Sequence, residues 1–203
     1  SSIPLVTLGT FLLWFGWFGF NGFSQLAMGT FDDVNAISKI AVNTHLAGAA
    51  GTVTGAALTR LIGGKTDIVM MLNGALAGLV AITAEPLTPG PITAMIIGSI
   101  GAVIMYFGTK MLESYGLDDV VGAIPVHMFA GIFGTLVVPF TNSDTSFGTQ
   151  LIGVISVCIF SFVLSYITFS SLKSTIGLRI SKAAEKQGTD KAEVGVTAYS
   201  IRD

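Results

Sequence analysis

Six apolar stretches, separated by turn-forming residues, constrain this chain more than any other feature of its sequence. An α-helix rises about 1.5 Å per residue and a bilayer core is about 30 Å thick, so helices of about 20 residues can cross it. Glycine, proline or asparagine marks the breaks at residues 63–64, 85–91 and 141–144. The pattern predicts an all-α polytopic membrane protein with six transmembrane helices, at residues 3–28, 36–61, 67–84, 92–112, 120–140 and 149–172.

The composition agrees with a membrane setting. Hydrophobic residues make up 51% of the chain and charged residues 11%, whereas soluble domains carry about 25% charged residues. The net charge of −2 argues against a nucleic-acid partner, which needs a basic face. The single cysteine, Cys158, excludes an internal disulfide and a cysteine metal site. Because the sequence also lacks a Ser/His/Asp set, a phosphate-binding loop and a metal cluster, we expect no enzyme activity and no cofactor.

Basic residues are distributed unevenly between the two ends of the predicted helices. With six helices, both ends of the chain lie on one side, and only Lys39 of the ten lysines and arginines falls on the other. The positive-inside rule places the basic side in the cytoplasm. After Leu172 the chain becomes polar, so residues 174–203 are predicted to form a cytoplasmic tail that begins with a short surface helix. Nine basic residues share the cytoplasmic side: Arg60, Lys65, Lys110, Lys173, Arg179, Lys182, Lys186, Lys191 and Arg202.

The first predicted helix carries a stripe that suits a small cation. Leu13, Trp17, Phe20 and Ser24 follow one another at i, i+4, i+7 and i+11, which places them on one helical face. Aromatic rings attract a cation through their π faces, and a hydroxyl oxygen accepts a hydrogen bond from it. An aromatic belt at the membrane interface, combined with helix packing, explains the same residues without a binding role.

One histidine lies within the fifth predicted helix. An ionisable side chain inside a membrane is costly when charged and indicates a functional site, and an imidazole can accept and pass on a proton. His127 is therefore a candidate proton relay; the alternative is a neutral ring that is hydrogen-bonded to a neighbouring helix. One helical stripe consists of small residues apart from the histidine: Ala123, His127, Ala130 and Gly134. This stripe borders either a narrow lumen or a tight helix contact.

Two carboxylate pairs have structural interpretations. Asp118 and Asp119 precede the fifth helix, where capping and the helix dipole favour negative charge, so we interpret them as a helix cap. Asp32 and Asp33 are interpreted as part of a solvated loop.

Four polar positions in the second and third predicted helices complete the candidates. His45 is predicted to be a packing or interface residue, and Asn43 and Thr44 are predicted to satisfy backbone or partner groups. Thr83 ends the third helix, where it either lines a vestibule or has only a structural role.

At these residues the chain resembles the ammonium transporter (Amt/Mep/Rh) family. The matching motifs are LGTFLLWFGWFGFN at residues 8–21, NT at 43–44, NGALAGLVAIT at 73–83 and LDDVVGAIPVH at 117–127. The tail segment GLRIS and the pair Ala198–Tyr199 also resemble the family. The resemblance implies an eleven-helix fold of two inverted halves, assembled as a homotrimer with one pore per subunit. This chain resembles helices six to eleven, which is the carboxy-terminal half.

The resemblance also implies roles for particular residues. By motif position, Trp17 and Ser24 belong to an outer ammonium-recruitment site, Phe20 is one of two gate phenylalanines, and His127 is one of two pore histidines. The other gate phenylalanine, the other histidine and half of the recruitment aromatics belong to the missing amino-terminal half. Gly122 departs from the pattern, because some relatives carry an acidic residue there. The remaining candidates for the pore wall are Leu13, Thr83 and Ala123.

The implied function is transport of ammonium or ammonia through the cell (plasma) membrane, as part of a complete transporter. Ammonium is recruited and deprotonated, ammonia crosses an apolar pore surrounded by protein and membrane lipid, and the proton crosses on the histidines. The tail implies a PII-type regulatory protein as a partner. Two alternatives stay open: a half-module that senses ammonium or assists assembly without transport, and a structural membrane protein in which His127 only packs.

Overall fold

The computed structural model describes residues 2–198, and these residues form helices and connections with no β-strand among them. The predicted all-α fold is therefore confirmed. Tyr199 and Arg202 lie outside the described residues. The chain divides into two compact units, residues 1–154 and 155–203, and the boundary falls within α6. The helices are α1 (Ile3–Phe23), α2 (Phe31–Gly63), α3 (Ile68–Thr83), α4 (Pro91–Ser114), η1 (Ile124–Phe129), α5 (Ala130–Val137), η2 (Val138–Phe140), α6 (Phe147–Thr175), α7 (Lys182–Gln187) and η3 (Asp190–Val194).

Three of these helices, α1, α4 and α6, are long and apolar enough to cross a membrane by length and composition alone. Two shorter apolar helical segments, α3 and the run from η1 to η2, also occur. The helix α2 has 33 residues and carries charged residues towards both of its ends. Each of the six predicted helices thus corresponds to one helical segment of the structure.

The first unit is built on close packing of α2 against α3 and of both against α4. Glycines permit this approach, because a Cβ added to Gly74 would lie only 2.6 Å from the carbonyl oxygen of Gly51. On the next turn of α2, a Cβ on Gly55 would lie 2.9 Å from the carbonyl oxygen of Met70. A cluster of buried side chains extends from this contact to α4 and consists of Ala47, Ala81, Ile82, Ala94 and Ile97.

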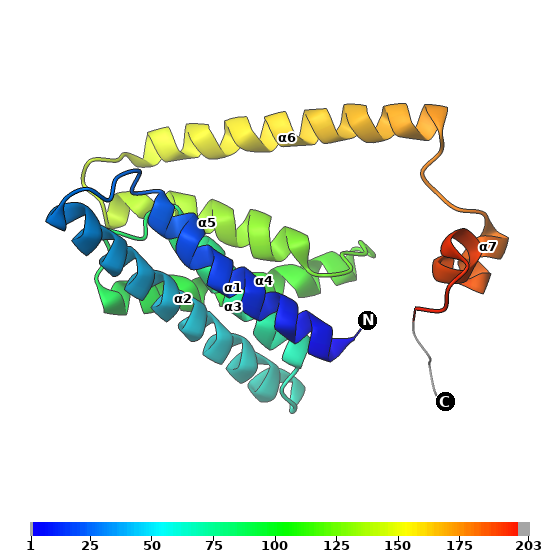
Figure 1. Ribbon diagram of the computed structural model, residues 1–203, viewed down its shortest axis with the longest axis horizontal. Coiled ribbons are helices and arrows are strands. Elements are labelled where there is room, and N and C mark those ends of the chain that lie inside the picture. The colour runs from blue at the N-terminus through cyan, green and yellow to red at the C-terminus, as the bar shows by residue number, and fades with distance from the viewer. Residues whose placement is uncertain (1, 199–203) are drawn as a thin grey trace. The chain divides into compact units, whose positions relative to one another are not determined.

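The helix α3 is the central element of the first unit. It packs against α1 as well as α2 and α4, and it also contacts η1 and α5 (Figure 1). Within the described residues, by contrast, α1 makes no Cα approach within 8 Å to η1 or α5. The helix α1 and the run from η1 to α5 carry the predicted site residues other than Thr83. Each of them is therefore supported by α3, and among the described residues they do not contact each other.

Basic residues are separated between the two ends of the first unit in the way that six alternating helices require. Lys65 and Lys110 line one cavity, where α2 ends and α3 begins. Lys39 lies beside residues 87–91, which connect the other ends of α3 and α4. There the amide of Asn43 donates to the carbonyl oxygens of Pro86 at 2.9 Å and Pro89 at 2.8 Å, which confirms its predicted backbone role. The side of the membrane on which each end lies stays a prediction.

The start of α2 corrects one prediction. Asp32 and Asp33 belong to its first turn and not to a solvated loop, because Thr30 and Asp33 close a capping box. The backbone N–H of Asp33 donates to Thr30 Oγ1 at 3.2 Å, and that of Thr30 donates to Asp33 Oδ2 at 3.0 Å. The side-chain hydrogen bond from Thr30, followed by its backbone hydrogen bond, lowers the pKa of Asp33 below its ordinary value.

The second unit contains the region predicted as the tail. Its helix α7 has six residues, none of them buried, and follows the N-cap residue Ser181, whose hydroxyl oxygen accepts from the N–H of Ala184 at 3.2 Å. The guanidinium of Arg179 pairs with the carboxylate of Glu185 at 3.2 Å, and both side chains are exposed. An exposed pair of this kind contributes little stability.

Candidate functional site

The indole of Trp17 is fixed to α3 by a chain of two hydrogen bonds. Its Nε1–H donates to Thr83 Oγ1 at 2.7 Å, and Thr83 Oγ1 donates to the carbonyl oxygen of Leu79 at 2.6 Å. Trp17 and Thr83 are both partly buried, whereas Leu79 is fully buried. Trp17 and Thr83, which the sequence indicates as separate candidates, are thus direct partners.

Phe20 and Ser24 extend this group along α1. The rings of Phe20 and Trp17 have centroids 6.0 Å apart and are tilted by 56°. The hydroxyl of Ser24 donates to the carbonyl oxygen of Phe20 at 3.0 Å. Because its proton is used in that bond, the exposed Ser24 oxygen has only lone pairs to offer. An aromatic pair beside such an acceptor is chemically suited to a cation that carries N–H groups.

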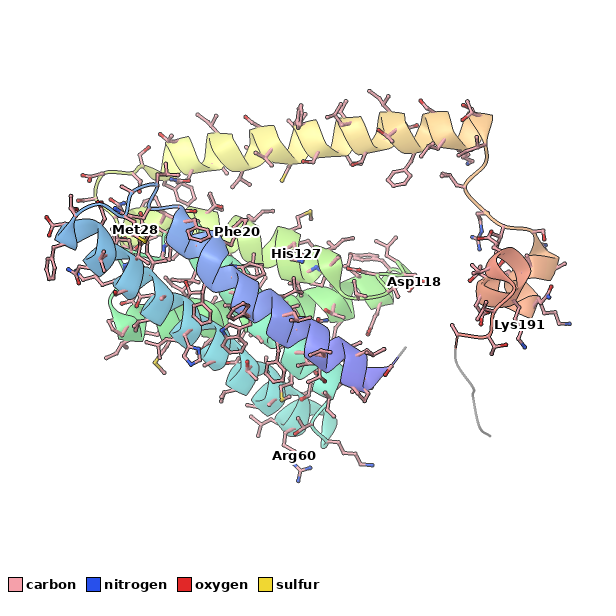
Figure 2. All side chains as sticks on the ribbon, viewed as in Figure 1. Phe20, Met28, Arg60, Asp118, His127 and Lys191 are labelled. Carbon is pink, nitrogen blue, oxygen red and sulfur yellow. The ribbon has the colours of Figure 1, made fainter. Side chains whose placement is uncertain are left out.

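His127 lies in the π-helical segment η1, and its side chain is exposed. Within residues 2–198 its imidazole has no hydrogen-bond partner. Figure 2 shows His127 on η1 and Phe20 on α1, the two segments that reach α3 but not each other. Within the described residues of the first unit no neighbouring helix holds the ring by a hydrogen bond, so the imidazole can bond to a further polar group.

The start of this segment confirms part of the predicted cap. The carboxylate of Asp119 accepts from the N–H of Ala123 at 2.9 Å and from that of Ile124 at 2.7 Å. Asp118 is exposed, and within the described residues it takes no part in the cap. The pair therefore contributes one capping residue.

The π-helical turn changes the predicted small-residue stripe. Ala123 and His127 are exposed, whereas Ala130 and Gly134 are buried, with Gly134 against the carbonyl group of Ala81. A regular helix would keep all four on one face, but a π turn with i→i+5 hydrogen bonds has more residues per turn and shifts the register. The stripe consequently provides an open surface in its first half and a tight contact with α3 in its second.

A second link to α3 precedes η1. The amide of Asn73 donates to the carbonyl oxygen of Val121 at 3.1 Å. Gly122 has a φ of 73°, and a Cβ there would lie 2.7 Å from Asn73 Nδ2. Glycine is the residue that adopts this conformation without strain. The departure from an acidic residue at Gly122 therefore has a local structural reason, and the sequence alone did not reveal it.

A buried polar pair joins α1 and α2; sequence reasoning predicted a partner for Thr44 but did not identify it as Asn21. Asn21 donates to Thr44 Oγ1 at 2.9 Å, and these residues are 1% and 0% exposed. The signal was present, because an asparagine inside an apolar helix requires a partner. His45 lies against two aromatic rings of α1, with centroids 5.5 Å from Trp14 and 6.2 Å from Phe18, as its predicted packing role requires.

The structure therefore assembles four of the predicted residues into one group, which we call the α1 group: Trp17, Phe20, Ser24 and Thr83. Leu13 is on the same helix and 52% exposed, while Ala123 and His127 belong to the separate η1 region. No group of three or more metal-ligating side chains occurs among the described residues 2–198.

A sequence profile described as the Ammonium Transporter Family matches residues 1–199. The chain belongs to this family. It is 41% identical to the ammonium transporter Amt2 of Archaeoglobus fulgidus, over 98% of this chain and 46% of that protein. It is 36% identical to the ammonium transporter Amt1 of Methanocaldococcus jannaschii, over 98% of this chain and 51% of that protein. The relatives are transporters and not enzymes, in agreement with the prediction.

Solved structures of this family share the fold. A structure named Sensor Amt Protein matches with a TM-score of 0.87 and 35% identity, covering 95% of this chain and 49% of that chain. The crystal structure of Candida albicans Mep2 matches with a TM-score of 0.81 and 26% identity, covering 90% of this chain and 44% of that one. The chain thus spans about half the length of the relatives it matches.

Proposed function

We propose that this chain is the carboxy-terminal half of an ammonium transporter and provides half of the wall of its pore. The observation that carries the proposal is the exposure of the predicted pore residues in a chain of this family. Phe20 is 64% exposed, and Ser24, Ala123 and His127 are exposed as well. When the opposite side of a pore comes from another segment, the pore-facing residues of this half are exposed while the helices behind them are packed.

The α1 group accounts for recruitment of ammonium at the pore entrance. Cation–π attraction is worth about 0.5–2 kcal/mol, and the lone pairs of Ser24 accept a hydrogen bond from the ion. Transfer of the bare ion into an apolar interior costs several kcal/mol even after relaxation. The group can therefore concentrate ammonium at the entrance, but it cannot carry the charged ion across the membrane.

Deprotonation beside Phe20 removes this obstacle. Neutral ammonia then passes the apolar surface, and the proton travels separately on His127 and on a histidine from the other half. The geometry that supports this step is the open imidazole, which has no partner within residues 2–198 and can exchange a proton with a second ring.

The complete transporter is proposed to be a multi-pass protein of the cell membrane. Both ends of this chain lie in the cytoplasm, and the subunits form a homotrimer. The polar region after α6 offers its exposed surface to a PII-type regulatory protein. These assignments follow from the family and from the distribution of the basic residues.

Recruitment is tested by replacing Trp17 and Ser24 in the complete transporter. The double variant W17L/S24A should raise the half-saturating concentration of methylammonium, with assembly unchanged. Gly9 has no neighbour within 4 Å, so G9A on the same helix is the matched control. An unchanged half-saturating concentration would reject the recruitment site.

The relay is tested separately by His127→Ala. Proteoliposomes containing this variant should show reduced flux or flux without accompanying proton movement, measured with radiolabelled methylammonium and an internal pH dye. Replacement of Ala123, which is exposed one turn earlier, by serine controls for a change of the pore surface. Wild-type flux with wild-type proton movement in the His127→Ala protein would eliminate the relay.

A second candidate function is ammonium sensing without transport. It is favoured by the similarity to the structure named Sensor Amt Protein. Calorimetric binding of methylammonium to purified protein that shows no flux in proteoliposomes would establish it. Measured flux that depends on Trp17 would reject it.

A further inference from the structure

We infer that Thr83 is a positioning residue that orients the recruiting indole of Trp17, and that lining the pore is not its main role. This inference rests on the proposed function of the α1 group. It assigns to the end of α3 a task in substrate recognition that the sequence pattern of α3 does not show.

The first step is the commitment of the Thr83 hydroxyl. It accepts from Trp17 Nε1 at 2.7 Å and donates to the carbonyl oxygen of Leu79 at 2.6 Å. Its only proton and one of its two acceptor positions are thus used within the protein. A passing cation would find one lone pair at a partly buried oxygen, whereas Ser24 is exposed and offers its lone pairs directly.

The second step is the rigidity of the acceptor. Thr83 is the last residue of α3, and Leu79, one turn earlier, is fully buried in the centre of the unit. The bond back to Leu79 fixes the hydroxyl relative to α3, since a β-branched side chain already has few χ1 conformations. Donor and acceptor bonds in such a chain strengthen each other. The indole is consequently held by the most closely packed helix of the unit.

The third step connects orientation to binding. Cation–π attraction requires the ion above the ring face, so it depends on the direction of the indole. Without an acceptor at residue 83, the partly buried N–H loses its partner, and the ring gains by rotating toward another one. Phe20, whose ring centroid is 6.0 Å from that of Trp17, would then be left without a fixed aromatic neighbour.

The experiment compares Thr83→Val and Thr83→Ser in the complete transporter. Valine has the shape of threonine without the hydroxyl, and serine keeps the hydroxyl without the methyl group. We expect T83V to raise the half-saturating concentration of methylammonium by between about twofold and about thirtyfold, the range that corresponds to loss of a cation–π contact. Maximal flux should change little, and T83S should retain the wild-type half-saturating concentration.

A double-mutant cycle with Trp17→Phe identifies the route of the effect. Phenylalanine cannot donate to residue 83, so T83V should have no further effect in the W17F protein. If W17F raises the half-saturating concentration and T83V does not, the positioning role is wrong and recruitment by Trp17 stands. If W17F itself has no effect, the recruitment proposal fails. Equal loss of maximal flux in T83V and T83S would assign Thr83 to the pore wall and overturn the inference.

Discussion

Gly74→Ala is the substitution that most directly tests the packing on which the site depends. An added Cβ would lie 2.6 Å from the carbonyl oxygen of Gly51 and 3.3 Å from the Cα of Gly55. Both neighbours are backbone atoms of α2, so no flexible side chain can move aside. Carbon and carbonyl oxygen ordinarily approach to about 3.3 Å, which leaves a deficit of about 0.7 Å. We expect α2 and α3 to separate by about that amount.

The expected free-energy change is a balance of two terms. Overpacking of a rigid contact costs about 1–3 kcal/mol, and this contact belongs at the upper end because both partners are helix backbones. Alanine is the better helix former by about 0.8–1.0 kcal/mol. The net result is destabilisation by about 1–2 kcal/mol. Gly9→Ala in α1 provides the control, since no atom lies within 4 Å of its added Cβ, and it should stabilise the chain by about 0.5–1 kcal/mol.

The assay is SDS-induced unfolding of the chain in mixed micelles, followed by tryptophan fluorescence. Trp14 reports on the α1–α2 contact near this packing, because a Cβ on Gly48 would lie 2.9 Å from both the Trp14 ring and Leu79. The two variants should differ by about 1.5–3 kcal/mol, the sum of their opposite effects. Equal stabilisation by Gly74→Ala and Gly9→Ala would refute the close α2–α3 contact.

Three further predictions concern the ends of the helices. Gly122→Ala should destabilise the start of η1 by about 1–2 kcal/mol, because its φ is 73°, and hydrogen exchange at the following amides should rise. Asn73→Ala should cost about 0.5–1.5 kcal/mol through the bond to Val121 and accelerate exchange in the same segment, which a wild-type exchange rate would contradict. The lowered pKa of Asp33 means that its capping contribution is fully present above the ordinary value of 3.8 and is lost as the pH falls through the lowered value. Amide exchange at the start of α2 should therefore rise at that acidity, and the rise should be absent in D33N.

The sequence predicted the helices well because their determinants are local. Apolar length identifies a helix that can cross a bilayer, and glycine or proline marks its ends. Where the bounds differ, the cause is a conformation that composition does not indicate. The first helix was predicted to reach Met28, but it ends at Phe23, and Leu26 then adopts a φ of 59°. The second begins earlier than predicted because a capping box forms at Thr30.

The candidate site could be predicted only in part because its decisive contacts join distant residues. Helical periodicity correctly placed Trp17, Phe20 and Ser24 along α1. Periodicity predicts the face of the helix on which a side chain lies, but it does not predict which distant residue that side chain contacts. Thr83 lies 66 residues from Trp17 in sequence, and nothing in the α3 motif distinguishes a hydroxyl that lines a pore from one that anchors an indole. The stripe through His127 divides into an exposed half and a buried half, which the prediction did not foresee because it assumed 3.6 residues per turn in a segment that forms a π turn.

The π turn at residues 124–129 makes the direction of the histidine sensitive to the number of residues in this segment. Each residue added to or removed from a helix rotates everything beyond it by about 100°. The imidazole of His127 and the buried Ala130 point to different surroundings only because this turn holds its particular number of residues. A one-residue deletion here would turn the histidine away from its open surface even if every functional side chain were kept. The position of the imidazole therefore depends on the chain length between Gly122 and Ala130 as well as on the histidine itself.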